Sequence, residues 1–315
     1  MNIHGIPLVT VGVASFNNST YLCETLDSIR QQEYPNWELI IVDDCSGDES
    51  IELVHQWLEE HPEVLGRLIV HEQNRGVSCV LNRILSEAKG EFLSVIGSDD
   101  LYESNKISNQ VRALQELPAD YAMCYSDIVL IDSRGDYINA GAKVVSPQGH
   151  PEGNVFSELL RSNFIPAMGQ LTRTAACREV GGFDEQLVVE DWDMWLRLAC
   201  RYKVKYVPGV VAKYRIHGRS AMATRAQALL VSCLQLISKH LGVSAATDEI
   251  AHVKLTQLAC ELYELGGPTA GDWLNRTWKW KPSKRSILYS AMTKVGISYS
   301  QAVRVRKKIR GLVGS

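Results

Sequence analysis

The sequence predicts an α/β protein in which a mostly parallel, Rossmann-like sheet is flanked by helices. Two observations carry this prediction. Short apolar runs alternate with helical patterns over residues 8–125, and the runs end on turn residues, as the run from Phe92 to Gly97 does before Ser98. Such alternation is typical of βαβ units, whose parallel sheet is covered on both faces.

The strand candidates of this first half, about residues 1–125, are residues 8–14, 38–44, 67–71, 92–97 and 121–127. Helical patterns lie between them, near 20–32, 50–60, 77–89 and 104–117. In the first helix Leu22, Leu26 and Ile29 follow i, i+4, i+7 spacing, which predicts the face that packs on the sheet.

The second half, about residues 126–224, changes character. Residues 131–137 ("IDSRGDY") predict a turn between two antiparallel strands, and residues 146–153 predict a loop. Helices are expected at 155–162 and 189–202, and strands at 203–209 and 210–218. We therefore expect a smaller, antiparallel half of the same domain. Beyond it, residues 225–315 predict a helical extension with helices at 225–242 and 249–267, followed by a basic tail.

Polar residues stand at four consecutive βα junctions of the first half. Ligands of open α/β sheets bind beyond the carboxyl ends of the strands, so these junctions predict one site. The junctions are Ser15-Phe16-Asn17, Asp43-Asp44, Asn74-Arg75-Gly76 and Ser98-Asp99-Asp100.

Two of these junctions carry adjacent acids, which repel each other and raise the cost of ionisation. A bound cation would relieve the repulsion between Asp99 and Asp100, and so would exposure to water. Mg²⁺ or Mn²⁺ suits such a place, because both take carboxylate oxygens together with substrate phosphates. The competing interpretation of Asp99-Asp100 is a turn that caps the following helix, and Asp43-Asp44 has the same alternative.

Standard phosphate-binding loops are missing. The first βα turn is "GVASFNNST" rather than G-x-G-x-x-G, and there is no Walker A sequence, which disfavours a nicotinamide cofactor and a P-loop. A metal would then have to handle phosphates, which again points to Asp99.

Two later groups of polar residues could take part in binding or catalysis. Glu190-Asp191 opens a helix, where acids are favoured by the helix dipole in any case. Arg215 and His217, with Arg219, lie near a loop and could hold phosphate, although a lone histidine is more often structural.

Cysteine usage and hydropathy predict a reduced, cytosolic, soluble protein. The eight cysteines show no C-x-x-C pair, the N-terminus lacks the pattern of a signal peptide, and no apolar run approaches the roughly 20 residues that a membrane span needs. The net charge of −3 gives no sign of a nucleic-acid partner, and nothing indicates an oligomeric state.

The tail is the exception to this balance, because residues 281–315 contain nine Lys and Arg and no acid. An anionic partner is expected, either a membrane surface on the inner face of the cytoplasmic membrane or a phosphorylated acceptor. A solvated helix face is the alternative.

The chain resembles the family 2 glycosyltransferases of the GT-A fold over roughly residues 7–220. The resemblance rests on an opening block, a middle block and two later blocks: "VGVASFNNSTYLCETLDSIRQQEYPNWELIIVDDCSGDES", "NRGVSCVLNRILSEAKGEFLSVIGSDD", "EVGGFDEQLVVEDWDMWLRLA" and "YRIHGRS".

The resemblance implies a role for each candidate residue. Phe16 would stack on the nucleotide base, and Asp44 would hydrogen-bond the base, usually uracil. Asp99 would bind Mg²⁺ or Mn²⁺ at the donor diphosphate, and His217 would approach the metal. Asp191 would be the catalytic base, with Glu190 beside it. The implied nucleotide-binding residues are Ala14, Phe16, Asn17, Asp43, Asp44, Arg75, Asn82 and Ser98.

Two positions depart from the family pattern. Gly97 stands where the D-x-D motif begins with Asp, which predicts a weaker metal site, and Leu81 stands where an Arg is common, which leaves donor selectivity open.

We therefore expect an inverting glycosyltransferase that moves a sugar from a nucleoside-diphosphate donor, with UDP favoured, to a glycan hydroxyl in bacterial cell-surface polysaccharide synthesis. A lipid-linked acceptor would suit the basic tail. The alternatives are a sugar nucleotidyltransferase, whose glycine-rich basic loop is absent, and a non-catalytic nucleotide- or glycan-binding module, which Gly97 would suit.

Overall fold

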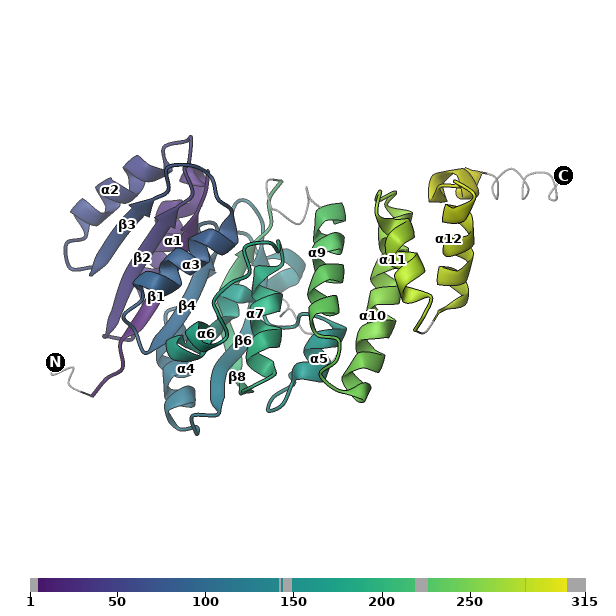
Figure 1. Ribbon diagram of the computed structural model, residues 1–315. Coiled ribbons are helices and arrows are strands. Elements are labelled where there is room, and N and C mark those ends of the chain that lie inside the picture. The colour runs from purple at the N-terminus through teal and green to yellow at the C-terminus, as the bar shows by residue number, and fades with distance from the viewer. Residues whose placement is uncertain (1–4, 142, 144–148, 219–225, 281, 305–315) are drawn as a thin grey trace. The chain divides into compact units, whose positions relative to one another are not determined.

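The computed structural model describes residues 5–141, 143, 149–218, 226–280 and 282–304 (Figure 1). Its chain divides into two compact units. The first comprises Met1–Gln186 with Glu190–Gly218, and the second comprises Leu187–Val189 with Arg219–Ser315. No helix among the described residues is both long enough and apolar enough to cross a membrane.

The first unit is built on one eight-stranded sheet of order β3-β2-β1-β4-β7-β6-β8-β5. The first four strands in this order are parallel, whereas β7 runs antiparallel to both β4 and β6. The predicted α/β class with a mostly parallel sheet is confirmed. The second part contains antiparallel pairs, of β7 with β4 and β6 and of β5 with β8, but β6 and β8 run parallel. The strands are β1 Val9–Ser15, β2 Trp37–Asp43, β3 Gly66–Val70, β4 Phe92–Gly97, β5 Leu101–Tyr102, β6 Tyr121–Ile131, β7 Gln170–Arg173 and β8 Lys203–Arg215.

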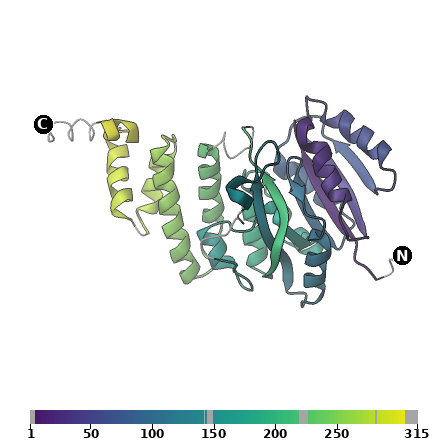
Figure 2. The same cartoon turned by 180° about the vertical axis from the view of Figure 1, so that it is seen from behind.

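Helices cover both faces of this sheet. α3, α6 and α7 lie in front of it in Figure 1, and α1 lies on the face that Figure 2 turns toward the viewer. Leu22, Leu26 and Ile29 of α1 are fully buried, as their spacing predicts. The helices are α1 Ser19–Arg30, α2 Ser50–Glu60, α3 Val77–Glu87, α4 Lys106–Gln115, α5 Phe156–Arg161, α6 Thr174–Glu179 and α7 Glu190–Ala199, with short 3₁₀ helices η1 Ile138–Gly141 and η2 Ala167–Gly169.

The second half of the first unit differs from the prediction in three places. The two strands expected at 203–209 and 210–218 form the single strand β8, because the irregularity near Gly209 (φ 125°) is absorbed as a register shift against β6. β7 and α6 were not predicted, since each is too short to show a period. The turn at 131–137 is present, with Gly135 at φ 87°, but its second arm is reduced to the isolated bridge between Ile131 and Tyr137 and one between Val129 and Lys143.

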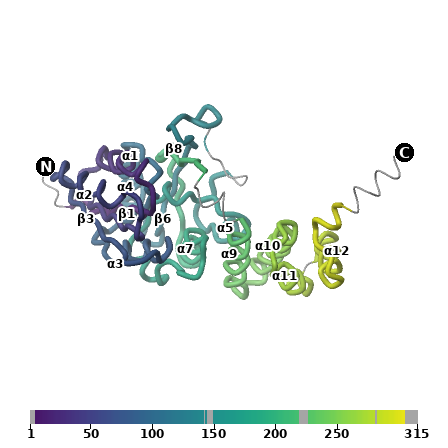
Figure 3. The backbone as a smooth tube through the Cα atoms, turned by 90° about the horizontal axis from the view of Figure 1, so that it is seen from above, coloured from purple at the N-terminus to yellow at the C-terminus, as the bar shows by residue number. Residues whose placement is uncertain are grey.

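The second unit is helical, and its helices lie side by side in chain order (Figures 1 and 3). α9 and α10 correspond to the two predicted helices, whereas α11 and α12 were not predicted as separate helices. α12 begins at a capping box, in which Ser283 and Ser286 each bond the other's backbone N–H. The bounds are α9 Ala226–Lys239, α10 Ala245–Glu264, α11 Ala270–Thr277 and α12 Lys284–Lys294.

Lys106, the first residue of α4, is fully buried and contacts β4, the strand that leads to Asp99 and Asp100. Lys106 Nζ donates to Ser94 Oγ at 2.9 Å, to Gln110 Oε1 at 2.7 Å and to the Gln170 carbonyl at 2.8 Å. Its ammonium also lies 4.6 Å from the centre of the Tyr102 ring. Burial nevertheless lowers the pKa of Lys106 to about 7, because the charged form loses its hydration.

This lysine predicts a pH dependence of stability. Between about pH 7 and the ordinary lysine pKa near 10, the unfolded chain binds a proton that the folded chain lacks, so stability rises with pH. We expect the free energy of unfolding of wild type minus that of Lys106→Met to grow by on the order of 1–2 kcal/mol from pH 7 to pH 9 in urea titrations. The surface variant Lys205→Met is the control. A difference that stays constant across this window would contradict the prediction.

Candidate active site

The polar junctions predicted from the sequence meet at the carboxyl edge of β1, β2 and β4. The Ser98 N–H donates to the Ala14 carbonyl at 3.1 Å, and the Asp44 N–H donates to the Ser15 carbonyl at 2.9 Å. Asn18 Nδ2 donates to Ser98 Oγ at 2.9 Å, which ties the start of α1 to the end of β4. The ends of the three strands therefore form one continuous surface.

Asp43 and Asn17 hold the loop after β2 in place. The buried Asp43 carboxylate accepts hydrogen bonds from Ser15 Oγ (2.8 Å) and from both the N–H and the hydroxyl of Ser46 (2.7 Å each). Asn17, at φ 51°, donates its N–H to Ser46 Oγ and accepts from the Gly47 N–H at 2.8 Å. Direct nucleotide contacts by these two residues stay predictions. Phe16, which precedes Asn17 in the chain, is 45% exposed, so its ring is accessible.

Asp44 organises the loop between β3 and α3. Its buried carboxylate accepts from the backbone N–H groups of Arg75 (2.9 Å) and Gly76 (2.7 Å), and it lies 2.8 Å from His71 Nδ1. The side chain of Arg75 is thereby set at an exposed position beside the edge of the sheet. His71 was missed by the sequence analysis, because nothing local distinguishes a histidine that closes a strand. The contact of Asp44 with a base remains a prediction.

Asn82 joins the middle block to the segment before α7. Its amide pairs in both directions with the backbone of Phe183, accepting at 2.7 Å and donating at 2.9 Å, and it donates to Glu185 Oε1 at 3.0 Å. A Cβ at Gly182, which has φ 73°, would lie 2.7 Å from the Asn82 oxygen, so only glycine suits this position. Asn82 thus has a supporting role in the structure, and its predicted nucleotide contact is untested.

Asp99 and His217 are brought together from positions 118 residues apart. Asp99 Oδ2 lies 2.9 Å from His217 Nε2, and the Asp99 side chain is 22% exposed. Gly97 stands against this pair, because a Cβ there would lie 2.8 Å from Asp99 Oδ1. Within the described ranges no three His, Cys, Asp or Glu side chains gather closely enough to hold a metal. Among the described residues, the candidate ligands for a cation at this place are the Asp99 carboxylate and His217 Nε2.

Asp100 has a different place from Asp99. It is 3% exposed and accepts the Arg215 N–H at 2.9 Å, which links the end of β4 to β8. Burial, together with the charge of Asp99, raises the pKa of Asp100 well above its ordinary value. The alternative that the acid pair caps the next helix is wrong, because α4 begins after Asn105 and β5 comes between.

Arg215 fixes the segment that carries both acids. Its side chain is 1% exposed, and Nε donates to the Asp99 carbonyl at 2.8 Å while Nη2 donates to Glu24 Oε2 at 2.6 Å. The guanidinium also donates to the Asp132 carbonyl at 3.3 Å and lies 4.6 Å from the centre of the Tyr21 ring. The suggestion that Arg215 holds phosphate is therefore wrong, since its donors face protein groups. Arg219 lies outside the described residues.

Glu190 and Asp191 form the first turn of α7. Asp191 Oδ2 accepts from Asn163 Nδ2 at 3.1 Å, and Oδ1 accepts from the Trp192 N–H at 2.6 Å. Burial raises the pKa of Asp191, and burial together with the charge of Asp191 raises the pKa of Glu190 to about 8. Both groups are therefore stronger bases than exposed carboxylates.

The pKa of Tyr214 is affected by an acid of α7 and by the two acids after β4. Its pKa is raised by burial and then by the charges of Asp100, Asp99 and Asp191, all of which act on its phenol. The charges of Asp99 and Asp191 therefore both act on this one phenol. Tyr214, the residue before the last of β8, opens the "YRIHGRS" block but was not predicted as a site residue.

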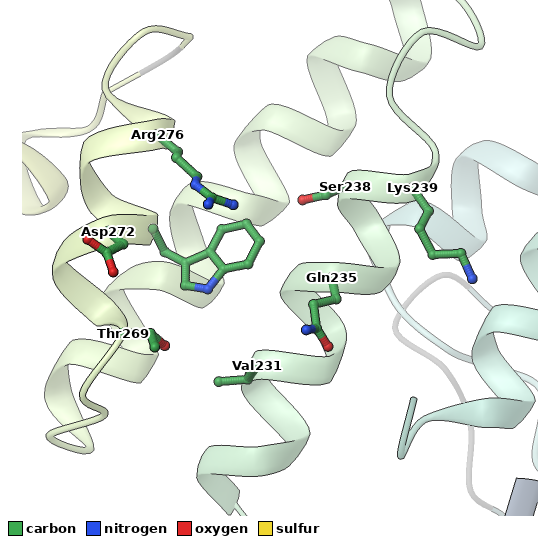
Figure 4. Close-up of a pocket in the computed structure, with 8 residues that line it drawn as sticks. Val231, Gln235, Ser238, Lys239, Thr269, Asp272 and Arg276 are labelled. Carbon is green, nitrogen blue, oxygen red and sulfur yellow. The ribbon is translucent and has the colours of Figure 1, made fainter. Parts of the chain in front are cut away.

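The second unit contains a separate pocket of about 520 Å³ (Figure 4). Arg276 of α11 points toward Ser238 of α9, whereas Lys239 points away, and the Arg276 guanidinium lies 5.0 Å from the centre of the Trp273 ring. The candidate site residues all belong to the first unit, so this pocket is distinct from them.

The sheet order and the edge site define a glycosyltransferase of the GT-A type. The chain belongs to the glycosyl transferase family 2, whose model matches residues 10–174. The predicted family, fold and enzyme class are thereby confirmed.

Curated relatives agree with this assignment. An uncharacterized glycosyltransferase of Rickettsia felis is 28% identical over 222 residues, which cover 69% of this chain and 35% of the relative. The putative teichuronic acid biosynthesis glycosyltransferase TuaG of Bacillus subtilis is 32% identical over 110 residues, which cover 35% of this chain and 43% of that protein. The chain thus spans about a third of the length of the Rickettsia felis relative.

Solved structures share the fold. The mannosyltransferase PcManGT from Pyrobaculum calidifontis, in complex with GDP-Man and Mn²⁺, has a TM-score of 0.61 at 20% identity and covers 94% of this chain and 82% of its own. TarS 1–349 of S. aureus, in complex with UDP-GlcNAc, has a TM-score of 0.60 at 15% identity, covering 92% and 93%.

The buried arginine predicts a large effect on stability. Arg215→Met removes the charge partner of Glu24 and the side-chain donor to the Asp99 carbonyl, so we expect a loss of about 3 kcal/mol in urea unfolding. Arg201→Met, which breaks an exposed ion pair with Glu179, is the matched control and should cost less than about 1 kcal/mol. Equal effects of the two variants would refute this role of Arg215.

Proposed function

We propose that the protein is an inverting glycosyltransferase that moves a sugar from a nucleoside-diphosphate donor, with UDP favoured, to a hydroxyl of a glycan acceptor. The observation that carries the proposal is the Asp99–His217 pair after β4, in a chain whose residues 10–174 match the glycosyl transferase family 2. The proposed setting is bacterial cell-surface polysaccharide synthesis, which the likeness to TuaG supports. We assign residues 1–224 to the transferase domain and 225–315 to a helical extension, in keeping with the division of the chain after Gly218.

The donor would lie along the carboxyl edge of β1, β2 and β4. The exposed Phe16 ring suits a stacked base, and the loop that Asp44 holds presents Arg75 toward an anionic ligand. Solved relatives in the same fold are titled as complexes with GDP-Man and with UDP-GlcNAc, which supports a nucleotide-sugar donor without choosing the base.

The Asp99–His217 pair would hold Mg²⁺ or Mn²⁺. The Asp99 carboxylate suits either ion, and the imidazole nitrogen 2.9 Å from it suits Mn²⁺ better than the oxygen-preferring Mg²⁺. The donor diphosphate would complete the coordination, since Gly97 contributes no carboxylate. When bound, the cation would stabilise the negative charge of the departing nucleoside diphosphate.

Asp191 would take the proton of the acceptor hydroxyl. An inverting transfer is a single in-line displacement at the anomeric carbon, so one carboxylate must accept this proton as the new bond forms. The hydrogen bond from Asn163 orients the Asp191 carboxylate, and its raised pKa makes it a stronger base than an exposed aspartate. Such a base contributes about 10²–10⁴ in rate.

The metal site is tested by calorimetry of UDP and Mn²⁺. We expect Mn²⁺ to bind weakly to the protein alone and at least tenfold more tightly with UDP present, because the pair supplies only two ligands. Asp99→Asn and His217→Ala should reduce this coupling, while the distant surface variant Arg201→Met should not. A UDP affinity that is the same with and without Mn²⁺ would instead favour a non-catalytic nucleotide-binding module.

The base is tested by paired variants of α7. Asp191→Asn should keep UDP affinity within about twofold and lower transfer by about 10²–10⁴, since it removes the proton acceptor while preserving shape. Glu190→Gln is the matched variant and should have the smaller effect on transfer from a nucleotide-sugar panel. If Glu190→Gln abolishes transfer and Asp191→Asn does not, the assignment is wrong by one residue.

A further inference from the structure

The outward face of α12 is an apolar stripe with a lysine at each end. Ile287 is 40% exposed, Leu288 56% and Val295, just past the helix, 70%. Lys284, Ile287, Leu288 and Ala291 follow the i, i+3, i+4, i+7 spacing of one helix face, and Lys294 and Val295 continue that face. We call these six residues, Lys284, Ile287, Leu288, Ala291, Lys294 and Val295, the α12 face.

The opposite side of α12 is packed into the second unit, so the orientation of the helix is settled by contacts. Ser286, Tyr289 and Ser290 are buried, and the Tyr289 hydroxyl donates to Glu264 Oε1 at 2.6 Å. Arg285 bonds the same carboxylate through Nε at 3.0 Å, so its charge is already compensated. Lys284 and Lys294 are the cations that belong to the α12 face.

A tryptophan extends the α12 face beyond the helix. Trp278 is 46% exposed, and Lys294 Nζ lies 5.6 Å from the centre of its ring. Tryptophan and lysine side by side are typical of the boundary between acyl chains and headgroups, where the indole is half buried and the ammonium reaches phosphate.

Charge decides what this face can bind. Residues 281–315 contain no Asp or Glu, so the α12 face has no anion within its own segment. In a two-fold pairing of α12 with a second copy, Lys284 would face Lys294 of the other copy, and like charges would meet without compensation. Anionic lipid headgroups supply the missing charge, and the acyl boundary takes the apolar side chains.

We propose that the α12 face is a membrane-docking surface that binds anionic lipid bilayers in the plane of the headgroups. Leu288 and Ile287 enter the acyl boundary, while Lys284 and Lys294 contact lipid phosphates. Docking would hold the enzyme at a membrane, where a lipid-linked acceptor is found, but the binding itself needs neither donor nor acceptor.

The experiment is co-sedimentation of the full chain with vesicles of phosphatidylglycerol and phosphatidylcholine, compared with phosphatidylcholine alone. We expect binding to the anionic vesicles only, weakened by added salt. The double variants Ile287→Ser/Leu288→Ser and Lys284→Glu/Lys294→Glu should each lower the bound fraction at least tenfold. Val253→Ser, which changes a 53% exposed side chain of α10, is the matched control and should bind as wild type does.

Two results would overturn the proposal. One is binding of both double variants at the wild-type level. The other is absence of vesicle binding together with a dimer in light scattering that Ile287→Ser/Leu288→Ser abolishes, which would assign the face to a second copy. Calorimetry of UDP and Mn²⁺ on the same variants should match wild type, so failure of docking and failure of the proposed transferase function are read separately.

Discussion

The candidate site depends on one buried guanidinium. Arg215 ends β8, yet its side chain donates to the Asp99 carbonyl after β4, to Glu24 of α1 and to the Asp132 carbonyl beyond β6. Burying an arginine is costly unless every donor finds a partner, so these four segments have little freedom to move independently. The same strand end carries His217 two residues later, and the position of His217 beside Asp99 follows from this attachment.

Two pairs of adjacent acids belong to the candidate site, Asp99-Asp100 after β4 and Glu190-Asp191 at the start of α7. Asp100, Glu190 and Asp191 all have raised pKa values, chiefly because their carboxylates lose hydration, and the charges of Asp100, Asp99 and Asp191 contribute to the raised pKa of Tyr214. Acids with strongly perturbed pKa values are costly in a folded protein, and they commonly mark functional sites. A cation beside Asp99 would offset part of this cost, and a proton acceptor with a raised pKa is suited to deprotonating a hydroxyl.

Several motif residues support the site rather than face it. Asp43, Asp44 and Asn82 are occupied by backbone N–H groups of neighbouring loops, and through those loops they set the positions of Phe16, Arg75 and the segment before α7. Exposure separates the two groups: Phe16 and Arg75 face outward, whereas Asp43 and Asp44 are buried. Members of one motif therefore differ in exposure and in their partners, and the nucleotide contacts of Asp44 and Asn82 stay predictions.

The sequence by itself determined the α/β class, the strands and helices of residues 8–125 except the two-residue β5, and the packing face of α1, because periodicity and turn residues are local signals. It also pointed to Asp99 and to the junctions beside it. Only the tertiary structure decided that Arg215 is buried, that β8 is one strand, that Asn82 pairs with Phe183, and that His217 meets Asp99 across 118 residues. These outcomes depend on contacts between segments that are far apart in the sequence. A short stretch of sequence does not show which distant residues it will contact. The same reason explains the α12 face: composition showed the basic tail, but packing of Tyr289 and Ser290 decided which side chains point outward.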